Sequence, residues 1–178
     1  MDEISIGIDT QLFSFLIDAW QLLGPEKDDP LYDEKIALAY LFFYHDGHMN
    51  RAPTVVKECE QIKDEERRKK HENFPFIPQM VPYKLQDLEK RKTYYKQFHT
   101  GERNENDCDI VAEAENCGCQ IFLTFDNQII KRLADKTKSM EILRPSEYWE
   151  RLNIPKGIEP KNSPRYDNPL KTNRWWEW

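Results

Sequence analysis

The sequence predicts an α/β domain with a three-layer α/β/α architecture, in which a central, mainly parallel sheet is covered by helices on both faces. Short apolar runs that suit strands alternate along the chain with longer segments whose apolar residues recur at helical spacing. The length of 178 residues suits one domain of ordinary size, and the hydrophobic fraction of 39% is enough for a core. These observations predict the fold class before any motif is considered.

The individual elements follow from local signals. Residues 4–8 alternate with a period of two and predict a strand, which stops at Asp9. A helix is predicted over 11–23, because its apolar residues recur at helical spacing and Gly24-Pro25 ends it. Pro53 fits the first turn of a later helix, which runs on into a strongly charged stretch. The other predicted elements are helices over 34–44, 84–98, 104–116, 127–134 and 145–152, strands over 49–52, 120–124 and 140–143, and a proline-containing loop over 73–83.

Residues 1–152 are therefore predicted to form the domain, and residues 153–178 an extended tail rich in Pro, Asn and Lys. The tail ends in a tryptophan cluster, Trp175, Trp176 and Trp178. Three such side chains in four residues are not expected to remain in water. Stacking on nucleic-acid bases is one interpretation, and docking on this subunit, a second subunit or another protein is the favoured one.

Composition and charge narrow the function classes. A net charge of −6 excludes a generically basic nucleic-acid binder, so attraction to a polyanion needs a local patch or a bound cation. No apolar run approaches the length of a membrane span, so no membrane partner is expected. The start Met1-Asp2-Glu3 lacks the basic region of a secretory signal, which favours a cytoplasmic location.

Two acids follow predicted strands directly: Asp9 after the first, and Asp126 after the strand over 120–124. The carboxyl ends of parallel strands meet at one edge of a sheet, where α/β proteins place their sites. Two carboxylates at that edge can share a cation. Each acid alone also has an ordinary interpretation as a helix N-cap.

Two further acids lie on predicted helices. Asp107 points to the centre of the apolar face of its helix, whereas Asp109 points nearly opposite. A carboxylate aimed at the core needs a partner, so Asp107 is a candidate metal ligand and Asp109 the reserve. Glu58 lies beside an apolar stripe, slightly closer to it than Glu60 does. A helix cap for Asp107 and a solvated face for Glu58 are the alternatives.

In order, the chain contains Ile8-Asp9-Thr10, Pro53-Thr-Val-Val-Lys-Glu58, Asp107-Cys-Asp-Ile-Val-Ala-Glu-Ala114 and Leu123-Thr-Phe-Asp126. This order over residues 4–145 resembles the PIN-domain family, whose members place acids at the corresponding points of strand and helix. Three features depart from the pattern: Ile129 stands where the family often has Phe, the segment 63–103 is long, and the tail is additional. These departures leave all four acids in place. They bear on which substrate and which partners the protein has.

The resemblance implies a metal-dependent endonuclease that acts on single-stranded or structured RNA in preference to DNA, leaving a 5′-phosphate and a 3′-hydroxyl. Carboxylates are hard ligands that suit Mg²⁺ or Mn²⁺, and one or two such ions would activate water and offset charge on the phosphate. The implied metal-binding and catalytic residues are Asp9, Glu58, Asp107 and Asp126. Thr124 is a secondary candidate for positioning water or substrate, with a plain strand role as the alternative.

The segment 63–103 carries eleven Lys and Arg against seven Asp and Glu, which is a local charge of +4. Such clusters can contact phosphates. Ordinary solvated helix faces, paired with neighbouring glutamates, are the alternative. The candidate contacts are Arg67, Arg68, Lys69, Lys70, Lys90, Arg91 and Lys92.

Two other functions compete. A phosphatase or phospho-acceptor module would carry two acids close together after the first strand, but Gly7 lies two positions before Asp9. A catalytically silent PIN-like module for binding or assembly is the stronger alternative. Within the family, small members include toxins neutralised by a partner protein and enzymes that process RNA, and the sequence leaves both roles open.

Overall fold

The protein is described by a computed structural model that covers residues 4–21 and 24–178. Within this part of the chain, a four-stranded sheet has the order β2-β1-β3-β4, and every neighbouring pair is parallel. The four predicted strands are confirmed, each within one or two residues of its expected bounds. Their observed bounds are β1 Ser5–Ile8, β2 His48–Arg51, β3 Ile121–Leu123 and β4 Glu141–Leu143.

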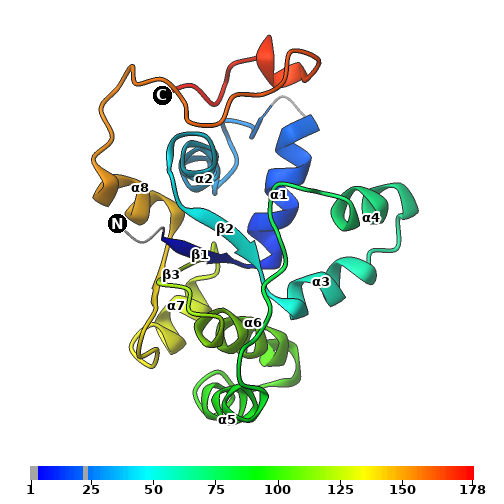
Figure 1. Cartoon of the computed structure of the whole chain (residues 1–178), viewed down its shortest axis with the longest axis vertical. Helices are drawn as coiled ribbons and strands as arrows, with labels where there is room; N and C mark the ends of the chain where they lie inside the picture. The colour runs from blue at the N-terminus through cyan, green and yellow to red at the C-terminus, as the bar shows by residue number, and fades with distance from the viewer. Residues whose placement is uncertain (1–3, 22–23) are drawn as a thin grey trace.

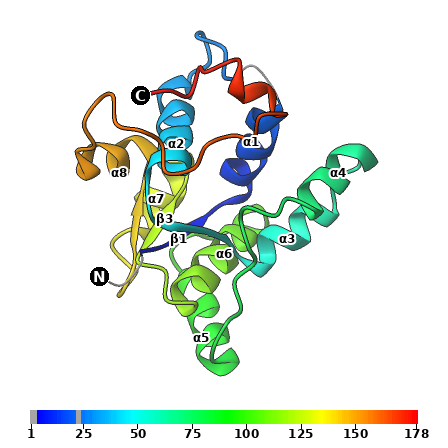
Figure 2. The ribbon, with the colours of Figure 1, turned by 45° about the horizontal axis from the view of Figure 1, so that its top comes forward.

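Helices lie on both sides of this sheet, with α1 and α2 on one side and α5 and α6 on the other (Figures 1 and 2). The arrangement is compatible with three layers. Positions 22–23, the predicted end of the first helix, lie outside the described residues, as does the acidic start at 1–3. No helix of the described ranges has the length and apolarity needed to cross a bilayer. The helices are α1 Thr10–Gln21, α2 Tyr32–Tyr44, α3 Pro53–Glu60, α4 Glu65–Glu72, α5 Leu85–Tyr95, α6 Glu105–Asn116, α7 Asn127–Leu133 and α8 Pro145–Leu152.

The close approach of α6 to the sheet depends on Gly7 in β1. A Cβ atom at Gly7 would lie 3.0 Å from the Cβ of Ala114 in α6 and 3.0 Å from the Phe122 ring in β3. Its neighbours Ile6 and Ile8 point to the opposite face and are fully buried. The glycine thus lets α6 lie directly on the central strands.

The prediction that the helix from Pro53 continues into the charged stretch was wrong. Helix α3 ends at Glu60, and α4 begins after Asp64. The side chain of Asp64 accepts a hydrogen bond from the backbone N–H of Arg67 at 2.7 Å, so it caps a new helix. This cap competes with continuation of α3, and helical periodicity alone does not reveal it.

The loop predicted over 73–83 is confirmed, and it also extends the pairing of β2. The backbone N–H of Arg51 donates to the Pro78 carbonyl at 3.0 Å, and the N–H of Met80 donates to the Arg51 carbonyl at 2.9 Å. A loop that contains prolines can therefore cover the open edge beside β2 without forming a regular strand.

Residues 153–178 contain little regular structure apart from a short 3₁₀ turn, η2 Pro169–Lys171, and they pack against α2 (Figure 1). The ring of Trp176 is buried, with its centroid 4.2 Å from that of Phe43. The ring of Trp178 lies 5.0 Å from Tyr40, and its indole N–H donates to the Ile154 carbonyl at 3.0 Å. These two tryptophans therefore dock on their own subunit, as the favoured interpretation allowed.

Candidate functional site

Asp9 lies at the carboxyl end of β1 and is only 6% exposed. Its Oδ1 accepts a hydrogen bond from the backbone N–H of Leu12 at 2.8 Å, so Asp9 caps α1. Its Oδ2 accepts a hydrogen bond from the Thr124 hydroxyl at 2.5 Å. Burial, with a contribution from the charge of Asp107, raises the pKa of Asp9 to about 6 against the opposing effect of these hydrogen bonds. Asp9 is both a helix cap and a perturbed acid at the sheet edge.

Thr124 connects Asp9 to Asp126 across two neighbouring strands. It follows β3, the neighbour of β1, and is fully buried. Its hydroxyl oxygen donates to Asp9 and also accepts from the backbone N–H of Asp126 at 2.9 Å. The Asp126 carboxylate then caps α7 by accepting from the N–H of Gln128 at 2.6 Å. Thr124 therefore orients both acids, while its contact with water or substrate stays a prediction.

Asp107 lies in the first turn of α6 and is half-buried. Its Oδ2 is 3.3 Å from Nε2 of His99, which is itself only 6% exposed. Burial raises the pKa of Asp107, and the charges of Asp126 and Glu58 raise it too, whereas His99 lowers it. Asp107 therefore interacts electrostatically with three other acids, Asp126, Glu58 and Asp9.

Glu58 is held in place by hydrogen bonds to both of its oxygens. The Thr10 hydroxyl donates to Oε2, and the Asn106 amide donates to Oε1 at 2.6 Å. The start of α3 is fixed by the buried Glu113, which accepts from Thr54 through its backbone N–H at 2.8 Å and its hydroxyl at 2.9 Å. The hydrogen bonds from Thr10 and Asn106 orient Glu58 toward the segments that carry Asp9 and Asp107.

Asp109 occupies a different environment from Asp107. Its carboxylate lies 3.1 Å from the Lys96 ammonium and 3.6 Å from that of Lys92, both on or next to α5. The helix therefore presents Asp107 to the other acids and Asp109 to compensating lysines. The choice of Asp107 over Asp109 as the member of the acid cluster agrees with this geometry.

A cavity of about 220 Å³ opens beside the acids. Asp126 and His99 contribute to its wall, and Arg132 of α7 adds a positive charge to it. Sequence reasoning missed His99 and Arg132. Neither lies in a motif or on a predicted apolar face. Packing of the segment after α5 against α6 brings His99 to Asp107, and Arg132 reaches the same cavity from α7. The other lining residues are Phe98, Thr100, Asn104 and Gln128.

The donor chemistry of the acid cluster suits a hard divalent cation, because its members offer carboxylate oxygens and because neighbouring negative charges help to raise the pKa of Asp9 and of Asp107. In the part of the chain that the structure describes, however, no three His, Cys, Asp or Glu side chains are grouped so that they could hold a metal ion. Oxygens of Asp9 and Glu58 already accept hydrogen bonds from protein groups. The cluster supplies suitable ligands, but they do not converge as they stand.

The candidate phosphate contacts divide into two groups. Those on α4 are all matched with carboxylates: Arg67 with Asp18, Arg68 with Glu72, Lys69 with Glu65 and Lys70 with Glu66. On α5, Lys92 binds the buried Glu113 at 2.8 Å, whereas Lys90 and Arg91 line a separate pocket. The pairing on α4 agrees with an ordinary solvated face, and nucleic-acid contact there stays a prediction.

Comparison with known proteins adds no identification. No model of a known protein family matches the chain, and no curated protein matches it either. The interpretation of the site therefore depends on the motifs and on the geometry described above.

Proposed function

We propose that this protein is a metal-dependent endonuclease of the PIN type that hydrolyses phosphodiester bonds in RNA at the cluster formed by Asp9, Glu58, Asp107 and Asp126. The observation that supports this proposal is that four acids from separate segments are held near one another. Thr124 links Asp9 to Asp126, and Glu58 accepts hydrogen bonds from Thr10 and Asn106, the sequence neighbours of Asp9 and Asp107. Excess negative charge at one sheet edge favours the binding of a cation.

In this proposal the four carboxylates would hold Mg²⁺ or Mn²⁺, which supplies Lewis-acid stabilisation of the phosphate and lowers the pKa of a bound water. Thr124 keeps Asp9 and Asp126 oriented through its two hydrogen bonds. His99 favours the ionised form of Asp107. Arg132, on the wall of the adjoining cavity, would contact the phosphate and offset the charge of the acids.

The test compares Asp107→Asn with Asp109→Asn. End-labelled single-stranded RNA is incubated with each protein in Mg²⁺, Mn²⁺ or EDTA. The two residues lie on the same helix, but only Asp107 interacts with the other acids, while Asp109 is paired with Lys92 and Lys96. We expect metal-dependent cutting that falls at least about 100-fold in Asp107→Asn and stays near wild type in Asp109→Asn.

Equal loss in both variants would point to misfolding, and circular dichroism of each variant checks this. Full activity of a folded Asp107→Asn protein would contradict the assignment of the site. Cutting that persists in EDTA would contradict the role of the metal.

A second candidate is a catalytically silent module of the same fold that binds a partner protein or a second subunit. The observation that favours it is that the acids already take hydrogen bonds from the protein and do not converge on one point. A silent module would show no heat of Mg²⁺ or Mn²⁺ binding in calorimetry. It would also retain its partner after Asp9→Asn.

A further inference from the structure

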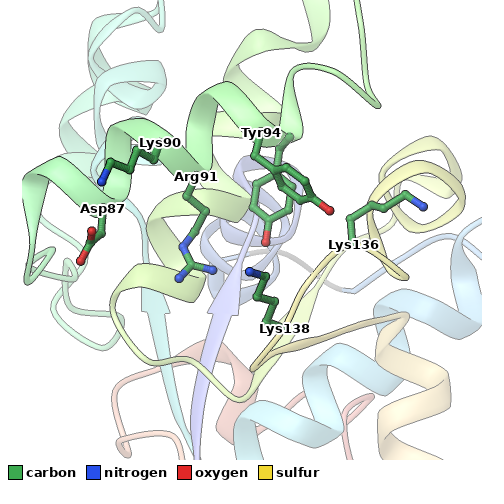
Figure 3. A pocket seen from close by; sticks show the side chains of 7 residues that line it. Asp87, Lys90, Arg91, Tyr94, Lys136 and Lys138 are labelled. Atoms are coloured by element: carbon green, nitrogen blue, oxygen red, sulfur yellow. The ribbon is translucent and has the colours of Figure 1, made fainter.

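A second concave site lies between α5 and the loop that joins α7 to β4. It is a pocket of about 390 Å³ (Figure 3). Lys90 and Arg91 reach it from α5, and Lys136 and Lys138 border it from the loop. Asp87 is the one acidic residue among the lining residues of the described chain. Four basic residues against one acidic residue, on a protein of net charge −6, mark a place where an anion is favoured.

Arg91 pairs with Glu115 and Lys136 pairs with Asp135, whereas the other two cations have no ion-pair partner among the described residues. In the described ranges, neither Lys90 nor Lys138 has a carboxylate within ion-pair distance, and both are exposed. This distinguishes them from the basic residues of α4, each of which has an acidic partner. Their charge is available to a ligand without first breaking an ion pair.

Arg91 lines the pocket, and a buried carboxylate fixes its position. Its Nη1 binds the buried Glu115, which also accepts hydrogen bonds from Tyr95 and from the backbone N–H of Lys138 at 2.6 Å. The Nε of Arg91 is buried and has no hydrogen-bond partner among the described residues. Figure 3 shows Arg91 and Lys138 extending toward the same space. An arginine that a buried carboxylate holds in place presents its other guanidinium N–H groups in a fixed orientation, which suits recognition of a phosphate.

Aromatic rings connect this pocket to the acid cluster. Tyr94 lines the basic pocket and is 38% exposed, and its ring centroid is 5.0 Å from that of Phe98. Phe98 in turn lines the cavity beside Asp126, and the Lys136 ammonium lies 5.0 Å from its ring. A single edge-to-face aromatic pair, Tyr94 and Phe98, therefore lies between the two sites.

We infer that the basic pocket binds a phosphate of single-stranded nucleic acid, with a neighbouring base stacked on Tyr94. A single strand fits better than a duplex, because stacking on a side chain needs an unpaired base and the phosphate must enter a concavity. The strand would run from the acid cluster past Phe98 to Lys90 and Lys138. The inference rests on the proposed function only in one respect, that the bound strand is taken to be the substrate of the nuclease.

The test measures binding in EDTA, so that cutting plays no part. The fluorescence anisotropy of a short, labelled oligouridylate is followed over a salt series for wild type, Lys90→Ala/Lys138→Ala and Tyr94→Leu. We expect the double variant to bind roughly tenfold more weakly, with the slope of log K against log salt reduced by about 0.7–1.4. Tyr94→Leu should bind at least about fivefold more weakly, with the salt slope unchanged.

Lys171→Ala is the matched control, because Lys171 is exposed, lacks an ion-pair partner among the described residues and lies in η2, far from α5 (Figure 1). Wild-type affinity and slope in the double variant would overturn the inference, as would absence of binding by wild type. Displacement of the oligonucleotide by an equal concentration of uridine monophosphate would also overturn it, because the ligand would then be a mononucleotide. A protein that binds as expected but never cuts would refute the nuclease and leave the pocket intact.

Discussion

Replacing Asp9 by Asn should stabilise the protein at neutral pH while it removes the proposed metal ligand. The carboxyl has a pKa of about 6 in the folded protein, against 3.8 for an ordinary Asp, chiefly because it is buried. At about 1.4 kcal/mol per pH unit, this difference makes the ionised carboxylate cost about 3 kcal/mol of folding free energy at pH 7. Asn keeps the size of Asp and can still accept from the Leu12 N–H, and its amide nitrogen donates to the Thr124 hydroxyl oxygen where the carboxylate accepted from that hydroxyl.

The sign of the pH dependence follows from the raised pKa. The folded protein binds this proton more tightly than the unfolded chain, so the contribution of Asp9 is most favourable below pH 3.8 and is lost as the pH rises through about 6. The stability difference between Asp9→Asn and wild type should therefore be near zero at pH 3.5. It should grow to about 3 kcal/mol at pH 7, which corresponds to roughly 6–12 °C in Tm for a chain of this size.

The assay is urea unfolding of both proteins in EDTA across this pH range, repeated with Mg²⁺ or Mn²⁺. A bound ion should stabilise wild type by about 2.7 kcal/mol at one hundred times its Kd, and should not stabilise Asp9→Asn to the same extent. A variant less stable than wild type at pH 7 in EDTA, or a difference that does not change with pH, would refute the reasoning from burial. Wild type that gains nothing from either ion would refute the metal site.

Two further predictions concern His99 and the docked tryptophan. His99→Phe removes the contact that lowers the pKa of Asp107. The acidic limb of the pH–rate profile for cleavage should therefore move to higher pH, and the Mg²⁺ concentration needed for cleavage should rise roughly 10–100-fold. Rate measurements over pH and over Mg²⁺ concentration test this, and unchanged profiles would contradict it. Trp176→Ala should cost about 3–5 kcal/mol in urea unfolding, because the ring is buried against Phe43, while RNA affinity of the folded protein stays the same. Weaker RNA binding at unchanged stability would instead indicate base stacking.

Much of the fold could be predicted from the sequence, because its signals are local. The period of two over residues 4–8, and the apolar faces of the helices, correctly predicted the strands and most helices. The same signals placed Asp9 and Asp126 at strand ends. Each of these depends on residues a few positions apart, whose side chains share a face by backbone geometry alone. The expectation that Asp109 points away from the core was wrong: its side chain is 22% exposed against 30% for Asp107, because α5 covers it with Lys92 and Lys96.

The tertiary structure decided what depends on contacts between distant segments. His99 beside Asp107, Thr124 between two acids, and Lys92 bound to Glu113 rather than free for a phosphate all arise where separate helices and strands pack together. A run of basic letters does not show which of its members meet a carboxylate, because that depends on the position of the next helix. The sequence by itself determined the fold class and the order of the acids, whereas only packing decided which charges are neutralised and which remain available.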